Sequence, residues 1–232
     1  MAITLVFIGS MLIGLPIAFV LGSTALYYFL FVGHIPLGMI GQKLYSGADN
    51  FILLAIPFFI LAGELMNRSR ITDALIKFSG LLVGRIPGAL AQINIVVSIF
   101  FAGITGSGVA DTAAIGSVLV PAMKKEGYSS EYAAAVTVAS SVIGPIIPPS
   151  IVMVIYSMTT GESVGALFAA GFLPGLAIAI SLMILSGYYA LKYKHPRSTE
   201  RHSLSYIFKT LKDSFVALMC PVVLVGGIFS GF

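Results

Sequence analysis

Long apolar stretches separated by short groups of charged residues run along this chain. Residues 1–42 contain no Asp, Glu, Lys or Arg, and Asp111 is the only charged residue between positions 86 and 123. Backbone in lipid must satisfy its hydrogen bonds internally, which favours helices. A helix needs about 20 predominantly apolar residues to cross a bilayer. The pattern therefore predicts an all-α polytopic membrane protein with about 5–6 transmembrane helices.

The boundaries of these stretches give the expected organisation. Residues 3–32 are long enough for one tilted span kinked at Gly14-Leu15-Pro16, and two short helices are the alternative. The expected segments are transmembrane helices within 1–66, a cytoplasmic surface helix at 67–85, a re-entrant hairpin at 86–123, a broken helix at 132–158, a transmembrane helix at 159–191, a cytoplasmic loop with an amphipathic helix at 192–213, and a last transmembrane helix at 214–232.

Composition supports a chain that is solvated by lipid. Hydrophobic residues make up 58% of the sequence and charged residues 9%, with a mean hydropathy of +1.02. A soluble domain cannot bury that much apolar surface. The net charge of +4 does not indicate a nucleic-acid partner, because the basic residues cluster between apolar stretches as in membrane loops. No basic segment precedes the first apolar stretch, so we expect a span there and not a cleaved signal peptide.

Two segments show the periodicity of amphipathic helices. Ile71, Ala74, Leu75, Phe78 and Leu82 fall on one helical face. A similar face, within residues 192–213, is formed by Leu204, Ile207, Phe208 and Leu211. Both segments are expected to lie along the membrane surface, with solvated linkers as an equally open alternative.

Charge placement predicts that residues 86–123 enter and leave the bilayer on the same side. The stretch from Ala113 to Met123 would be about 16 Å long as a helix, against a hydrocarbon core of about 30 Å. Basic residues flank both ends of the segment. With both ends in the cytoplasm, 12 of the 13 Lys and Arg residues lie on that side, all but Lys43. This agreement is the main support for a re-entrant hairpin.

The tip of this hairpin, residues 103–112, is unsuited to continuous helix and carries polar groups. Its glycines allow the backbone to turn and to approach another segment closely. We expect the returning helix to start near Val109, so that its free N–H groups attract an anion such as a substrate carboxylate. A buried Asp111 would repel that anion unless a cation such as Na⁺ lies between them. The alternative is that Asp111 is satisfied by the N–H groups of its own helix.

A second break falls at residues 144–150, near the middle of the next apolar stretch. Proline removes a backbone donor and displaces the carbonyl four residues earlier. Pro145, Pro148 and Pro149 would therefore free the carbonyls of Ser141, Gly144 and Pro145, beside the hydroxyls of Ser140, Ser141 and Ser150. Such hard oxygen ligands suit an alkali cation. A purely structural kink is the alternative.

The two breaks together define the candidate site. The candidate substrate- and ion-binding residues are Thr105, Gly106, Ser107, Gly108, Asp111, Thr112, Ser141, Gly144, Pro145, Pro148 and Ser150. The candidate Na⁺ ligands among them are Ser107, Asp111, Ser141, Gly144 and Pro145. We expect no catalytic residue and no cofactor apart from this coupling ion.

Several other polar residues are weaker candidates. Glu64 is expected to reach the membrane interface. Gln92 and Asn94 are expected to form hydrogen bonds between helices. His34, His195 and His202 are too scattered along the chain to suggest a metal site.

Residues 54–67, 103–117 and 143–150 resemble corresponding motifs of the large permease subunit (DctM type) of tripartite ATP-independent periplasmic (TRAP) transporters. The resemblance runs along essentially the whole chain. It implies a multi-pass protein of the bacterial inner membrane that takes part in Na⁺-coupled import of organic anions such as C4-dicarboxylates or sialic acid. Its implied partners are a small membrane subunit of the DctQ type and a periplasmic substrate-binding protein.

The resemblance also implies an elevator mechanism, in which hairpins and broken helices carry the substrate past a fixed scaffold. Residues 1–66 would then be scaffold helices, 67–85 an arm helix, and 86–158 half of the transport domain. Family members are about twice as long and carry an inverted second half. Because this chain ends where that half would begin, we expect an N-terminal fragment.

Two alternatives remain at this stage. One is a structural fragment that does not transport. The other is an intramembrane aspartyl enzyme that uses Asp111, which would require a second facing carboxylate.

Overall fold

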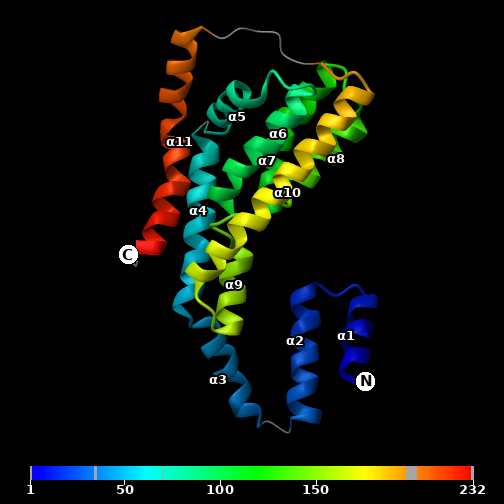
Figure 1. Ribbon diagram of the computed structural model, residues 1–232. Coiled ribbons are helices and arrows are strands. Elements are labelled where there is room, and N and C mark those ends of the chain that lie inside the picture. The colour runs from blue at the N-terminus through cyan, green and yellow to red at the C-terminus, as the bar shows by residue number, and fades with distance from the viewer. Residues whose placement is uncertain (1, 34–35, 70, 197–202, 231–232) are drawn as a thin grey trace. The chain divides into compact units, whose positions relative to one another are not determined.

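The computed structural model describes residues 2–33, 36–69, 71–196 and 203–230. Within these ranges every regular element is a helix and none is a strand, which confirms the all-α class (Figure 1). The chain divides into two compact units, residues 1–51 and 52–232, and each is described by itself. Arg70, Arg197, Arg201, His34 and His202, which entered the expectations above, lie outside the described residues.

The first unit contains two short helices that pack against each other, α1 (Ala2–Leu12) and α2 (Ile17–Tyr27). A π-helical turn η1 (Tyr28–Val32) extends α2, and α3 (Leu37–Ala48) follows. Gly14 adopts a φ of 83°, and the hydroxyls of Ser10 and Ser23 lie 3.3 Å apart across the helix pair. Of the two alternatives for residues 3–32, the structure therefore shows the two short helices and not the single kinked span, because the left-handed glycine reverses the chain.

The second unit packs around one central helix. Its helices are η2 (Phe51–Leu54, which begins at the boundary between the units), α4 (Ala55–Arg68), α5 (Ile71–Val83), α6 (Ala89–Thr105), α7 (Gly108–Lys125), α8 (Ser130–Ser141), α9 (Ile151–Thr160), α10 (Val164–Lys192) and α11 (Leu204–Ser230). Helix α6 contacts α4, α5, α7, α8, α10 and α11. Ile95, Val97 and Phe101 of α6 are fully or almost fully buried. The core therefore lies along α6, between the helices that surround it (Figure 1).

Helix α5 packs on α6 and α11 through a narrow stripe of its surface. Its buried residues are Thr72, Leu75, Ser79 and Val83, whereas Leu82 is 56% exposed. The Ser214 hydroxyl of α11 donates a 2.9 Å hydrogen bond to the Ala74 carbonyl. Small polar residues occupy the packed stripe because they allow two helices to approach closely.

Helix α11 is continuous through the point where the sequence suggested a separation. The expected surface helix ending at Leu211 and the expected span starting at Phe215 are one helix. No Gly or Pro occurs between Ser205 and Cys220 to interrupt it. Among the described residues, α10 and α11 are individually long and apolar enough to cross a membrane, and α3 with α4 forms a third span if taken as one bent crossing. The other apolar helices are shorter.

Candidate ion and substrate site

The first helix break separates α6 from α7 by two residues. Gly106 ends α6 with a left-handed backbone, φ 59° and ψ 17°. Ser107 is extended and caps α7, its Oγ accepting a 3.4 Å hydrogen bond from the Ala110 N–H. Helix α7 therefore begins one residue before the expected Val109, and a serine, not Asp111, caps its N-terminus.

The second break separates α8 from α9, and like the first break it ends at a serine that caps the next helix. Residues 142–149 form turns, with a cis peptide bond between Pro148 and Pro149. The Ser150 Oγ accepts a 3.2 Å hydrogen bond from the Met153 N–H, which caps α9. Ser107 and Ser150 thus play the same part at the two breaks, and each precedes the partly positive N-terminus of a helix.

The two breaks lie against each other, backbone to backbone. A Cβ atom added to Gly106 would overlap the Pro149 carbonyl oxygen, and one added to Gly108 would lie 2.7 Å from the Ser141 oxygen. A Cβ on Gly144 would lie 3.1 Å from the Gly108 nitrogen. The Thr112 hydroxyl also donates a 2.6 Å hydrogen bond to the Ser141 Oγ. Gly106 and Gly108 leave no room for a side chain between the segments, and Gly144 leaves little.

Asp111 is fully buried beside this contact. Neither carboxylate oxygen has a hydrogen-bond partner of ordinary geometry among the described residues, although the Ser98 hydroxyl of α6 lies near enough to interact. The alternative of a carboxylate satisfied by its own helix N–H groups does not describe this residue. Burying a charged carboxylate costs several kcal/mol unless another group compensates its charge. Asp111 is therefore the residue that says most about what the site binds.

A buried network of side chains connects α6 to α8 close to Asp111. Ser98 donates to Ser140 at 3.0 Å, Ser140 donates to the Asn94 Oδ1 at 3.0 Å, and the Asn94 Nδ2 donates to Thr137 at 2.7 Å. The interhelical role expected of Asn94 is confirmed. So is that of Gln92, whose side chain donates to the Met183 carbonyl of α10 at 3.0 Å.

Sequence reasoning did not select Ser98 and Thr137 as members of this site. The sequence could have indicated both residues, because each lies three or four positions from another polar residue and would share a helix face with it. Asn94 and Ser98 are such a pair on α6, and Thr137 and Ser140 are one on α8.

The carbonyls expected to be free at the second break are largely occupied. The Ser141 carbonyl accepts a 3.0 Å hydrogen bond from the Gly144 N–H, and the Pro145 carbonyl accepts one of 2.6 Å from the Ser150 Oγ. The chain compensates for the missing proline donors through a tight turn and a serine. Each carbonyl oxygen keeps a second lone pair, so these groups can still act as ligands.

A pocket of about 400 Å³ opens beside the first break. Of the predicted site residues, Thr105 and Ser107 line it, whereas Asp111, Thr112 and the residues of the second break do not. Helix α4 forms the opposite wall through Phe59, Gly63 and Glu64. Sequence reasoning placed Glu64 at the membrane interface and missed this wall, because only the packing of α4 against α6 brings it there.

Discontinuous helices that meet with their N-termini beside polar side chains are characteristic of secondary transporters. Fold and site therefore define a class, the polytopic membrane transport proteins. No group of three or more His, Cys, Asp or Glu side chains suited to a metal ion occurs in the described part of the chain.

The family described as "Tripartite ATP-independent periplasmic transporter, DctM component" matches residues 4–232, and the chain belongs to it. It is 39% identical to the sialic acid TRAP transporter large permease protein SiaM of Vibrio cholerae over 97% of this chain and 52% of that protein. It is 37% identical to the C4-dicarboxylate TRAP transporter large permease protein DctM of the same species, over 100% of this chain and 52% of that protein.

A third relative is the 2,3-diketo-L-gulonate TRAP transporter large permease protein YiaN of Escherichia coli, 36% identical over 98% of this chain and 54% of YiaN. The chain thus spans about half the length of the relatives it matches. These relatives are transporter permeases, not enzymes.

Proposed function

We propose that this chain forms part of the large permease of a Na⁺-coupled TRAP importer of organic anions in the bacterial inner membrane. The observation that carries the proposal is the contact of two helix breaks beside a buried Asp111, whose carboxylate has no hydrogen-bond partner of ordinary geometry in the described part of the chain. The relatives' names give sialic acid, a C4-dicarboxylate and a diketo sugar acid as substrates, and all three are carboxylates. A carboxylate substrate is the class that we propose here.

The site has two kinds of group, and they suit opposite charges. The N-termini of α7 and α9, capped by Ser107 and Ser150, favour an anionic group. Asp111, Ser141 and the carbonyls of Gly144 and Pro145 are oxygen donors suited to Na⁺. The uncompensated Asp111 oxygens fit a cation at this position, and the bound ion would couple uptake to the Na⁺ gradient.

The proposed mechanism is an elevator in which the two breaks move as one body. The backbone contacts between Gly106, Gly108 and the second break would hold the two breaks together during the movement. The proposed partners are a small membrane subunit of the DctQ type and a periplasmic substrate-binding protein, consistent with the tripartite family.

The test is Asp111→Asn in the complete permease, assembled with its partners in proteoliposomes. We expect Na⁺-dependent uptake to fall at least about tenfold, because removing a charged ligand weakens cation binding by more than about 1.4 kcal/mol. Ser107→Ala should lower uptake less. The matched control is Asp73→Asn on the exposed face of α5, which should transport normally. Unchanged Na⁺ dependence in both Asp111→Asn and Ser107→Ala would remove the two residues from the site.

A further inference from the structure

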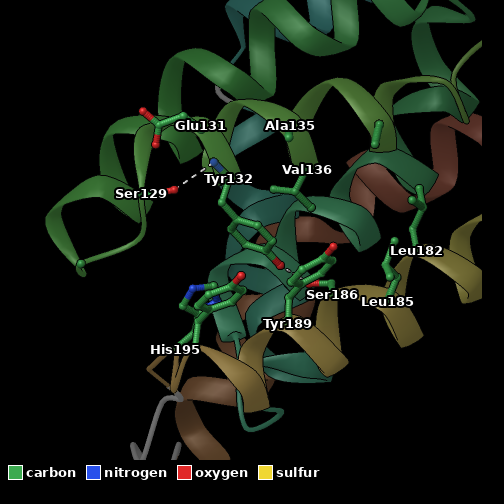
Figure 2. A pocket seen from close by; sticks show the side chains of 13 residues that line it. Ser129, Glu131, Tyr132, Ala135, Val136, Leu182, Leu185, Ser186, Tyr189 and His195 are labelled. Atoms are coloured by element: carbon green, nitrogen blue, oxygen red, sulfur yellow. Dashed lines mark hydrogen bonds between the residues drawn. The ribbon is translucent and has the colours of Figure 1, made fainter.

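A second, larger pocket lies between α8 and α10, away from the helix breaks. Its volume is about 730 Å³, and Figure 2 shows it between the two helices, with Tyr132 and Val136 on one side and Leu182, Leu185 and Ser186 on the other. One part of its wall is apolar and consists of Ala135, Val136, Ala139, Leu182 and Leu185. The other part is formed by Gly127, Ser129, Glu131, Tyr132, Ser186, Tyr189, Tyr193 and His195. The pocket is therefore amphipathic along its length.

The polar part is built from aromatic rings that support one another. The Tyr132 ring centroid lies 6.0 Å from that of Tyr189 and 4.8 Å from that of His195, and Tyr189 stacks on Tyr193 at 5.9 Å. The Tyr132 and Ser186 hydroxyls lie 2.9 Å apart and link α8 to α10 (Figure 2). These contacts hold the ring faces at this end in a defined arrangement.

This end of the pocket presents groups that attract a cation, beside lysines that attract an anion. Glu131 is the only Asp, Glu, Lys or Arg among the described residues that line the pocket. Hydrogen bonds from its own backbone N–H and from Ser129, together with the nearby charge of Lys124, lower the pKa of the exposed Glu131, so it is ionised at neutral pH. Burial lowers the pKa of His195, so the imidazole is neutral, and its buried Nδ1 has no hydrogen-bond partner among the described residues. A carboxylate, tyrosine faces and a neutral imidazole all attract a cation.

The position of the pocket matches the surface region of a bilayer. Lys124, Lys125, Lys192 and Lys194 flank this end of α8 and α10, and Lys192 Nζ lies 5.5 Å from the Tyr193 ring centroid. Tyrosines and basic residues gather where a helix meets the lipid headgroups. Exposed apolar residues such as Ile184 and Leu191 continue along α10. An occupant must therefore combine a cationic group with a hydrocarbon chain, and basic residues beside the pocket suit an adjacent phosphate.

We propose that the pocket between α8 and α10 binds a phospholipid whose headgroup carries a primary ammonium, of the phosphatidylethanolamine class. The ammonium lies at Glu131, His195 and the tyrosine rings. One acyl chain lies along Ala135, Ala139 and Leu185. A phosphatidylglycerol lacks the cation and fits only the apolar part. This site is separate from the proposed transport site and does not depend on it.

The experiment measures lipid binding to the complete permease by native mass spectrometry in detergent, with added phosphatidylethanolamine or phosphatidylglycerol. We expect phosphatidylethanolamine to bind about tenfold more tightly than phosphatidylglycerol, because its ammonium makes one ionic contact and cation–π interactions with the tyrosine rings. Glu131→Gln should remove that preference. Ala135→Phe should weaken both lipids about tenfold or more by filling the apolar part. Ala134→Phe, the neighbouring exposed residue outside the lining, is the matched control and should bind as the unaltered protein does.

Three results would overturn the proposal. Equal affinity of the unaltered protein for the two lipids would show that the pocket does not recognise the ammonium group. Equal lipid binding by Ala135→Phe and Ala134→Phe would show that no acyl chain lies against Ala135. A photoreactive benzophenone side chain at Leu185 should crosslink to lipid in the folded complex, and crosslinking to protein alone would show that another polypeptide covers the pocket. Free ethanolamine should bind at least about a hundredfold more weakly than the lipid, since it lacks the chain.

Discussion

At the scale of the residue, the glycines at the two breaks are distinguished by what surrounds them. Gly106 combines a left-handed φ of 59° with direct contact to the Pro149–Ser150 backbone. Gly127 has a similarly left-handed φ of 89°, yet no atom of the described residues lies within 4 Å of the Cβ it would carry. The first position is constrained by conformation and by packing, and the second by conformation alone. Substituting Gly106 and Gly127 in turn therefore separates the effect of backbone conformation from that of packing.

We expect Gly106→Ala to destabilise the protein by about 2–4 kcal/mol, because the strained φ and the overlap with Pro149 add together. Gly127→Ala should cost about 1 kcal/mol. Thermal unfolding of the two purified variants in the same detergent gives the comparison. Equal losses of stability would mean that the breaks do not pack against each other as described.

At the scale of the element, α6 and α8 are joined by buried hydrogen bonds as well as by apolar packing. Asn94 uses both ends of its amide, one toward Ser140 and the other toward Thr137. Hydrogen bonds between helices in a membrane protein add modest stability, but a buried polar group left without a partner costs more. The network therefore specifies how α6 and α8 align near Asp111.

We expect Asn94→Leu to lower the free energy of unfolding by about 1–3 kcal/mol, since it removes the shared partner of two buried hydroxyls. Ser181→Ala is the control, because the exposed Ser181 hydroxyl donates within its own helix, to the Ala177 carbonyl. Its stability should change by less than about 0.5 kcal/mol. Thermal unfolding of the complete permease measures both, and an Asn94→Leu protein as stable as Ser181→Ala would exclude a stabilising network.

At the scale of the whole molecule, the distribution of charge and the path of α6 and α7 predict a membrane orientation. Arg85 precedes α6, and Lys124 and Lys125 end α7. The two helices are joined by a two-residue break and pack against each other. Helices that turn back in this way have both outer ends on one side of the bilayer, with the break at depth.

Single cysteines introduced into a Cys220→Ser background test this orientation in cells. Arg85→Cys and Lys125→Cys should both react with a membrane-impermeant maleimide only from the cytoplasmic side. Glu162→Cys, in the loop after α9, should react from the periplasmic side. Labelling of positions 85 and 125 from opposite sides would make residues 86–123 a single crossing and would exclude the re-entrant hairpin.

Local chemistry determined a large part of this structure from the sequence alone. The apolar stretches specify helices in lipid, because backbone without water must bond to itself. Lone prolines such as Pro121, Pro174 and Pro221 lie inside continuous helices. The breaks could be located within a few residues because glycines cluster around Gly106 and three prolines follow Gly144 within five residues. The interhelical roles of Gln92 and Asn94 followed from amides placed inside apolar helices.

Other features depend on groups far apart in the chain, and only the tertiary structure decided them. Ser98 meets Ser140, and Glu64 lines a pocket with Ser107, because separate helices pack together. The partners of the Ser141 and Pro145 carbonyls, Gly144 and Ser150, are close in sequence, but they were mispredicted because an irregular turn brings them together. Periodicity shows which residues share a helix face, whereas the neighbouring helix determines which of those faces is buried.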